Sequence, residues 1–287
     1  MNHVPFGSAS PSTTATDPFQ TGAALGRRTM LAAGLATTAG LVLTGATPAA
    51  AVSVGRAPHL PAVVLVHGAF VDGSSWSGVV LALQRAGMRV VAVQLDLDSI
   101  AEDAETVQRA IVQVGGPVIL VGHSYGGGVV TAAGQDNPAV KALVYAAAFA
   151  PDEGETLGEL SGRFPPTPVL KSLVPDSSGR LIIDRAAFPA VFAPDVPRHR
   201  ARVLTAVQGS VSGATFAEPL TGVPAWRQVP TWFQVSALDR VVHPDLQRFF
   251  AARMNAKTTT LSTGHASPVS RPRQIAALIQ RAAIAVC

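Results

Sequence analysis

The stretch from Leu120 to Gly128 has the sequence LVGHSYGGG, which places one serine, Ser124, inside a frame of glycines. Its central pentapeptide, Gly122 to Gly126, matches the pattern G-x-S-x-G, in which a serine stands on a sharp turn between a strand and a helix. Glycines two residues before and after the serine remove side chains that would collide with the neighbouring strand and helix. Ser124 is therefore the predicted nucleophile.

A serine hydroxyl is a weak nucleophile at neutral pH, so it needs a base whose tautomer is fixed by a third group. With this type of turn, the acid and then the histidine follow the serine along the chain. His265, in the loop STGHASP after the last predicted strand, is the predicted base. Asp239, in VSALDRVVHP after the preceding strand, is the predicted acid, and Asp245 is its alternative. Weaker candidates on loops at the same edge are Asp72, Asp96 and Asp98.

The substrate oxygen that becomes negatively charged during the attack needs backbone N–H donors. One predicted donor is the N–H of Tyr125, directly after the serine. The other belongs to the loop HGAFVDGSSW, where the N–H of Ala69 is the first choice and that of Phe70 the second. His67 is predicted to brace this loop and to take no part in proton transfer.

Strands and helices alternate around these residues. Short apolar runs predict buried strands, and apolar stripes at helical spacing predict helices between them. The predicted strands are 62–68, 88–95, 117–122, 140–149, 229–238 and 257–262. Because near-continuous apolar strands are typical of a parallel sheet covered on both faces, the predicted class is α/β. We expect a mostly parallel central sheet with helices on both faces.

The alternation is interrupted at about 151–225 by proline-rich stretches with short helical segments between them. A long insertion inside a compact domain is usually functional, so this segment is predicted to be a helical lid. Aromatic residues in or beside it could line an apolar pocket for small or medium acyl groups, or form the lid's own core. These residues are Phe149, Phe164, Phe188, Phe192, Phe216, Trp226 and Trp232.

Residues 1–51 have the pattern of a secretory signal peptide. Arg27 and Arg28 precede an apolar run of small residues, and Ala49-Ala50-Ala51 offers a cleavage site. The arginine pair predicts export by the twin-arginine route, which leaves 52–287 as a secreted domain without stable membrane association. The alternative is a membrane anchor, because the run from Thr29 to Ala46 is near the lower limit for a bilayer span.

Composition limits the classes of function. The chain has 287 residues, 48% hydrophobic and 14% charged, which is typical of a globular protein. The formal net charge is +4, and no run of five Lys or Arg occurs, so the sequence does not predict nucleic-acid binding. Cys287 is the single cysteine, which excludes a disulfide within the chain and a zinc site built from cysteines. These observations do not set the oligomeric state.

Four separated motifs, LVHGAF, GHSYGG, ALDRVV and GHASPVSRP, occur in this order. From about Pro61 to Ala285 the chain resembles the α/β-hydrolase superfamily and, within it, small bacterial esterases related to plant methyl-ester esterases and hydroxynitrile lyases. The resemblance implies a Ser-His-Asp mechanism through an acyl-enzyme, with no cofactor and no metal. It leaves the substrate open, since this fold carries many activities.

Three functions follow as hypotheses. The leading one is a secreted serine esterase that cleaves small-molecule carboxylic esters. The second is a hydroxynitrile lyase, whose known members tend to carry Thr where Gly68 stands and Lys where Ala266 follows the histidine, so both departures favour hydrolysis. Ser124 argues against dehalogenases and epoxide hydrolases, because enzymes of these two classes with this fold use an aspartate at that position. The third hypothesis is a ligand-binding protein without catalysis.

Overall fold

Six strands form one sheet in residues 60–287, which are the residues described by this computed structural model. All neighbouring pairs run parallel, in the order β2-β1-β3-β4-β7-β8. The predicted α/β class is therefore confirmed, whereas the predicted signal peptide lies outside the described residues. The strands are β1 (Ala62–Val66), β2 (Val90–Ala92), β3 (Val118–His123), β4 (Val140–Ala146), β7 (Thr231–Ser236) and β8 (Lys257–Leu261).

The two edge strands differ from the central ones in sequence and length. β2 pairs with β1 over only three residues, so most of the strand predicted at 88–95 is irregular. β8 has the sequence KTTTL and is largely exposed. Polar and charged residues on an edge strand discourage pairing with another chain, which explains why β8 lacks the apolar run of β1 and β3.

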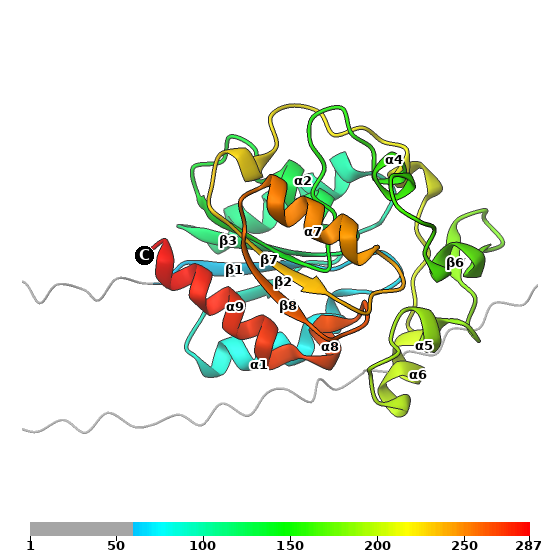
Figure 1. Ribbon diagram of the computed structural model, residues 1–287. Helices are drawn as coiled ribbons and strands as arrows, with labels where there is room; N and C mark the ends of the chain where they lie inside the picture. Colours follow the sequence, from blue (N-terminus) through cyan, green and yellow to red (C-terminus); the bar gives the residue numbers. More distant parts are fainter. Residues whose placement is uncertain (1–59) are drawn as a thin grey trace, which may run out of the picture. The chain divides into compact units, whose positions relative to one another are not determined.

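Helices cover both faces of the sheet (Figure 1). On one face lie α1 (Ser77–Arg85) and α9 (Pro272–Ala285); on the other lie α2 (Ile100–Val114), α3 (Tyr125–Ala133) and α7 (Pro244–Arg253). Because successive strand residues point to opposite faces, Val63 and Leu65 of β1 pack with the first group, and Val64 and Val66 with the second. Each such buried side chain contributes about 1.5–3 kcal/mol relative to exposure.

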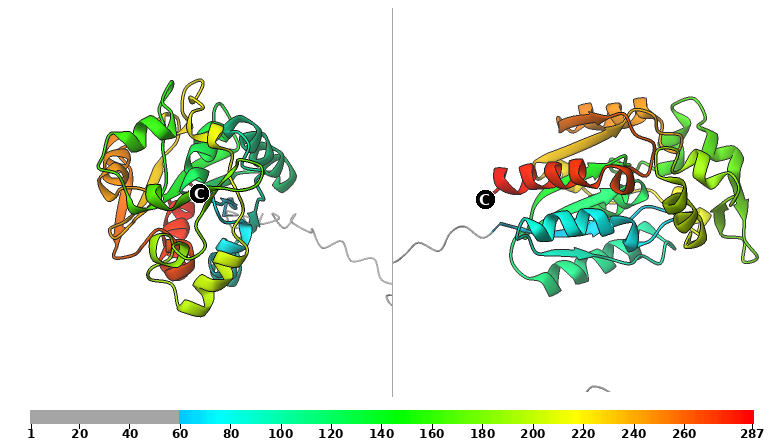
Figure 2. Two further views of the ribbon diagram at one scale, coloured as in Figure 1. Left: turned by 90° about the vertical axis from the view of Figure 1, so that its right-hand side faces the viewer. Right: turned by 90° about the horizontal axis from the view of Figure 1, so that it is seen from below.

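The chain between β4 and β7 forms the lid (147–230), which Figures 1 and 2 show at the edge where the strands end. Its α-helices and strands are α4 (Leu157–Gly162), β5 (Leu173–Pro175), β6 (Leu181–Ile183), α5 (Phe188–Val191) and α6 (Arg198–Ala206). β5 and β6 pair antiparallel, so the lid is not wholly helical. The lid also contains the short helices η2 (Pro168–Ser172), η3 (Gly213–Phe216) and η4 (Ala225–Arg227), whereas the short helices η1 (Gly73–Trp76) and α8 (Ser267–Ser270) lie outside it.

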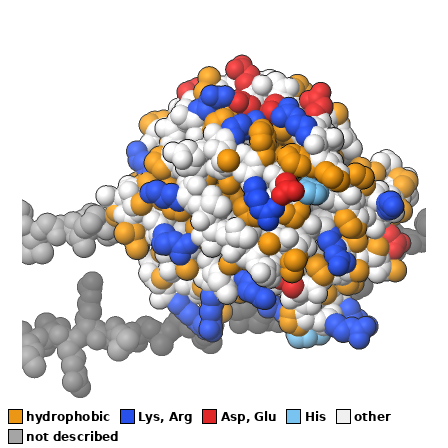
Figure 3. Space-filling view, in the orientation of Figure 1, with side chains coloured by type: hydrophobic (Ala, Val, Ile, Leu, Met, Phe, Trp, Pro, Cys, Tyr) orange, Lys and Arg blue, Asp and Glu red, His pale blue; other side chains and the backbone are white. Residues whose placement is uncertain are grey.

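The surface of the described residues mixes charged and apolar groups. On the face shown in Figure 3, Lys and Arg side chains are scattered among hydrophobic and neutral ones. Among residues 60–287, no helix combines the length and the apolar character that crossing a bilayer requires. Cys287 is exposed and unpaired with another cysteine in this part of the chain.

Candidate active site

Ser124 occupies the turn between β3 and α3 with a positive φ of 54° and a ψ of −123°. A non-glycine residue rarely adopts such a conformation, and the strain persists only where the surroundings hold it. Here the N–H of Ser124 donates to Ala146 O at 3.3 Å, and its carbonyl accepts from Gly127 N and Phe149 N, both at 3.0 Å. The turn therefore fixes Ser124 at the carboxyl end of the sheet.

Close backbone approach explains the glycines around Ser124. A Cβ on Gly122 would lie 2.5 Å from the carbonyl oxygen of Gly126, and one on Gly126 would lie 2.5 Å from the carbonyl oxygen of His67. A Cβ on Gly68 would lie 2.8 Å from the Cβ of Ser124. No side chain fits at these three positions without a shift of the backbone.

His265 and Asp239 form a buried pair. His265 Nδ1 lies 2.8 Å from Asp239 Oδ2, and both side chains are 0% exposed. Asp239 Oδ1 accepts from Val241 N at 2.8 Å and from Val242 N at 3.1 Å. Because the carboxylate accepts a hydrogen from Nδ1, the neutral imidazole keeps its lone pair on Nε2, where a base needs it.

Gln247 is a partner of this pair that the sequence analysis missed. It lies fully buried in α7, and its Nε2 donates to Asp239 Oδ2 at 2.8 Å and to Val242 O at 2.9 Å. Its Oε1 accepts from Ser236 N at 2.8 Å, at the end of β7. A signal was present, because Gln247 interrupts the buried stripe that Leu246, Phe250 and Ala251 form on this helix.

His123 connects the turn that carries Ser124 to the loop that carries His265. Its Nε2 lies 3.0 Å from the carbonyl oxygen of His265, and the two ring centroids are 4.7 Å apart. Burial, and after it the charge of His265, lowers the pKa of His123 well below its usual range, so this ring stays neutral. Within the described residues, His265 Nε2 is buried and makes no hydrogen bond to Ser124 or another group. Catalytic hydrogen bonds often tighten only when substrate binds.

His67 braces the loop after β1 from a buried position. Its Nδ1 lies 2.9 Å from Gly68 O, and its Nε2 accepts from Leu95 N at 3.0 Å, so the ring is neutral with the proton on Nδ1. Burial lowers its pKa, which favours this form. Since a trans peptide directs its C=O and N–H oppositely, fixing Gly68 O also fixes the direction of the N–H of Ala69.

Ala69, Phe70 and Tyr125 line one cavity together with Ser124. Tyr125 is the first residue of α3, where the N–H groups lack intrahelical acceptors and the helix dipole favours negative charge. Phe70 has a positive φ of 65°, which is strained for a bulky residue. The three residues predicted to supply N–H donors thus line the same cavity as Ser124, on the loop after β1 and at the start of α3.

This cavity has a volume of about 540 Å³, and none of the described residues that line it has a charged side chain. Three of the aromatic residues considered for a pocket, Phe149, Phe164 and Phe216, form part of its wall. Phe188 and Phe192 are buried in the hydrophobic core and are not part of the lining. Trp226 and Trp232 lie outside the lining. The other apolar wall residues, from the lid and its flanks, are Pro166, Val169, Leu170, Leu173, Leu181 and Val241.

The other carboxylates considered for the acid make different contacts. Asp245 is exposed at the start of α7 and pairs with Arg248. Asp72 accepts from Ser74 N at 2.8 Å as the cap of η1, and Asp98 pairs with a lid arginine. Among residues 60–287, no three His, Cys, Asp or Glu side chains are grouped so that they could hold a metal ion.

Residues 63–278 match the sequence profile of the alpha/beta hydrolase family. The chain belongs to this family. It is similar to a probable hydrolase from Phoma sp., at 26% identity over 240 residues, which cover 76% of this chain and 96% of that protein. It is also similar to a carbendazim hydrolyzing esterase from Nocardioides sp., at 35% identity over 132 residues, which cover 42% of this chain and 51% of that esterase.

Among solved structures, a pyrethroid hydrolase from Sphingobium faniae shares the fold with a TM-score of 0.67 at 23% identity. The match covers 78% of this chain and 98% of that one. The predicted family and fold are therefore confirmed. Because the relatives of this alpha/beta hydrolase are hydrolases and esterases, the predicted class of enzyme, a carboxylic ester hydrolase, is confirmed as well.

Proposed function

We propose that this alpha/beta hydrolase cleaves carboxylic esters with Ser124 as nucleophile, His265 as base and Asp239 as orienting acid. The observation that carries the proposal is the fully buried hydrogen bond between Asp239 and His265, whose carbonyl oxygen contacts His123, the residue before the strained serine that lines the cavity. A buried carboxylate on Nδ1 both selects the tautomer and stabilises the imidazolium that forms during the attack.

The reaction begins when His265 Nε2 takes the hydroxyl proton of Ser124, whose Oγ attacks the carbonyl carbon of the ester. The carbonyl oxygen becomes an oxyanion that accepts hydrogen bonds from the N–H groups of Tyr125 and Ala69, with Phe70 as the second choice on the loop. One such donor contributes about 10²–10³ to kcat. His265 then protonates the leaving alkoxide, and the alcohol departs.

The second half of the reaction removes the acyl group from Ser124. His265 takes a proton from a water molecule, and the resulting hydroxide attacks the acyl carbon. When the tetrahedral intermediate collapses, His265 returns the proton to Ser124 Oγ and the carboxylic acid leaves. Asp239 remains ionised throughout and balances the charge of the imidazolium.

The cavity supports an uncharged ester with an apolar acyl group as substrate. Apart from Ser124, the side-chain hydroxyls in its lining are engaged elsewhere: Ser161 Oγ donates to Leu157 O at 2.9 Å, and the Tyr125 hydroxyl donates to Asp103 at 2.7 Å. A charged group in the cavity would lose its hydration without a partner. Relatives named for carbendazim and pyrethroid hydrolysis support small organic substrates of this kind.

The position of His265 supports the cavity as the site of the acyl group. The leaving-group oxygen must lie next to His265 Nε2 to receive its proton, and His265 is outside the cavity lining. Because acyl group and leaving group point in different directions from the attacked carbon, the acyl group extends into the cavity. Phe192, whose ring centroid lies 4.9 Å from that of His265, limits room on the alcohol side.

The contacts of Gly68 argue against the lyase hypothesis. A threonine there, as in hydroxynitrile lyases, would place its Cβ 2.8 Å from that of Ser124 in this backbone.

We also propose where the enzyme acts. Residues 1–51 direct its export by the twin-arginine route, and Arg27-Arg28 with Ala49-Ala50-Ala51 support this.

Turnover of p-nitrophenyl acetate and labelling by a fluorophosphonate, followed by peptide mass spectrometry, test the proposed function. We expect ester turnover and a label on Ser124 alone. A lyase would cleave cyanohydrins with little ester turnover, and a ligand-binding protein would show neither activity nor labelling. Either outcome would contradict the proposed esterase.

A further inference from the structure

Arg180, at the tip of the lid hairpin just before β6, binds two separate parts of the chain. Its guanidinium pairs with Asp98 and donates to Asp96 O at 2.9 Å and Leu97 O at 3.2 Å, all on the loop between β2 and α2. It also donates to Ser210, at 3.1 Å to both Oγ and the carbonyl oxygen. A guanidinium has a rigid fork of donors, so one side chain can hold both segments at once.

The residue after Arg180 is part of the cavity wall. Leu181 lines the cavity, as does Leu173 on the paired strand β5. The backbone of Leu181 exchanges hydrogen bonds with Val211, at 2.9 Å from its N–H and 3.0 Å to its carbonyl oxygen. Ser212 N in turn donates to Leu97 O at 2.9 Å. The hairpin wall is thereby attached to the core at the loop that Arg180 binds.

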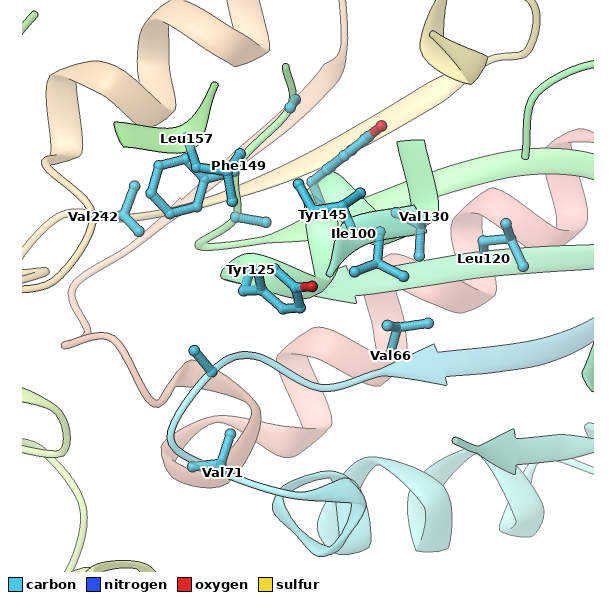
Figure 4. Packing of buried hydrophobic residues seen from close by; sticks show 14 of the residues in the cluster. Val66, Val71, Ile100, Leu120, Tyr125, Val130, Tyr145, Phe149, Leu157 and Val242 are labelled. Atoms are coloured by element: carbon cyan, nitrogen blue, oxygen red, sulfur yellow. The ribbon is translucent and has the colours of Figure 1, made fainter. Parts of the chain in front are cut away.

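The same loop is tied to the predicted oxyanion donor. Asp103 Oδ1 accepts from Asp96 N at 3.1 Å and Leu97 N at 3.3 Å, and its Oδ2 accepts from the Tyr125 hydroxyl at 2.7 Å. Figure 4 shows Tyr125 near Ile100, which opens the helix that carries Asp103. Burial, and then the charge of Asp103, raises the pKa of Tyr125, which keeps its hydroxyl protonated as a donor.

We propose that Arg180 is a specificity-determining, positioning residue of the esterase. It fastens the hairpin wall of the acyl cavity to the loop that Asp103 joins to Tyr125, and so it fixes the distance between the wall and the reacting carbonyl. The inference rests on the proposed function, because it takes the cavity as the acyl site. Arg180 itself contacts neither Ser124 nor His265, so it acts on acyl fit and not on bond breaking.

Without the guanidinium, the contacts described above leave only the backbone bonds through Val211 and Ser212 between Leu181 and the loop, so Leu181 is held less firmly while the triad is undisturbed. For p-nitrophenyl esters that fill the cavity, we expect Arg180→Ala to raise KM about tenfold and to change kcat less than threefold, which is the pattern of lost binding common to ground and transition states. The preference among acyl chains from acetate to octanoate should flatten. Arg180→Lys keeps the charge but not the fork, and should give an intermediate loss.

Arg185→Ala is the matched control. Arg185 follows the same hairpin, is exposed, and donates to Thr205 O at 2.8 Å within the lid, so its loss leaves the wall attached. We expect its KM series to equal that of the wild type. The proposal is overturned if Arg180→Ala keeps the wild-type chain-length profile. It is equally overturned if kcat falls alike for every ester at constant KM.

Amide hydrogen exchange tests the attachment without any substrate. In Arg180→Ala we expect the amides of Leu181 and Val211 to exchange at least about tenfold faster, while β3 keeps its protection. Unchanged exchange at these two amides would overturn the proposal even in a protein that hydrolyses no ester. Wild-type protein without turnover or Ser124 labelling would instead count against the proposed function, and the two failures are thus distinguishable.

Discussion

Asp239 and His265 stand 26 positions apart in the chain, yet their side chains form a 2.8 Å hydrogen bond from which solvent is excluded. The two residues come together because β7 and β8 are adjacent parallel strands, and the loops that carry Asp239 and His265 follow their carboxyl-terminal ends. Val241 N, Val242 N and Gln247 hold the carboxylate. The proposed chemistry of Ser124 depends on this pair.

Replacing the proposed acid tests its role against the nearby alternative. In Asp239→Asn the side chain keeps its shape but favours the wrong imidazole tautomer, and we expect kcat/KM to fall by about 10²–10⁴. Asp245→Asn should change kcat/KM by less than about tenfold, because Asp245 is exposed and pairs with Arg248. Steady-state kinetics on p-nitrophenyl butyrate measure both. A reversed order would make Asp245 the acid.

Gln247 should matter for both stability and rate. Gln247→Leu leaves Ser236 N without its buried partner, which costs about 1–3 kcal/mol, and it removes one of the two hydrogen bonds to Asp239 Oδ2, where that of His265 remains. We expect a lower urea midpoint and a kcat reduced with little change in KM, since Asp239 loses one contact that orients it. Gln274→Leu, an exposed change on α9, is the control. Equal behaviour of the two variants would contradict this role.

The buried histidines predict how stability depends on pH. The pKa values of His67 and His123 are lowered from the usual 6.5, so below that pH the unfolded chain binds protons that the native state does not. The free energy of unfolding should therefore fall as the pH falls below about 6.5, by up to about 1.4 kcal/mol per pH unit for each histidine. Urea unfolding between pH 5 and pH 8 measures it.

A variant separates this effect from carboxylate titration, which sets in at lower pH. In His123→Asn, the slope of the free energy of unfolding against pH between pH 5 and pH 6.5 should decrease by the amount that one bound proton contributes. This holds whatever the variant's effect on absolute stability. Identical slopes in wild type and variant would show that His123 already binds a proton in the native state.

The leader gives a prediction about the exported protein. If residues 1–51 act as a twin-arginine signal, protein in the culture fluid should begin near Val52, and changing Arg27 and Arg28 to lysine should stop its appearance there. Intact mass spectrometry of culture fluid and membranes decides. Full-length protein held in the membrane fraction would support the anchor hypothesis instead.

Local pattern and chain order predicted Ser124, Asp239 and His265 for one site, because the turn motif and the strand ends carry that information, and the structure pairs Asp239 with His265. Gln247, Asp103 and Arg180 were not predicted, since each acquires its contact through folding: Arg180 meets Asp98 across 82 positions. The lid hairpin was also missed. The turn DSSG at 176–179 offered a signal, with Gly179 at a positive φ of 82°.

The most direct test of the central claim is to look for the acyl-enzyme. Wild-type protein mixed with excess p-nitrophenyl acetate and quenched with acid within the first turnovers should gain the mass of one acetyl group, on the peptide that contains Ser124. Ser124→Ala should gain no acetyl group, should lose activity by about the 10⁶ seen for the serine of subtilisin, and should keep its thermal midpoint within a few degrees. Ser124→Ala that retained a tenth of wild-type turnover, or an acetyl group found on another residue, would contradict the account.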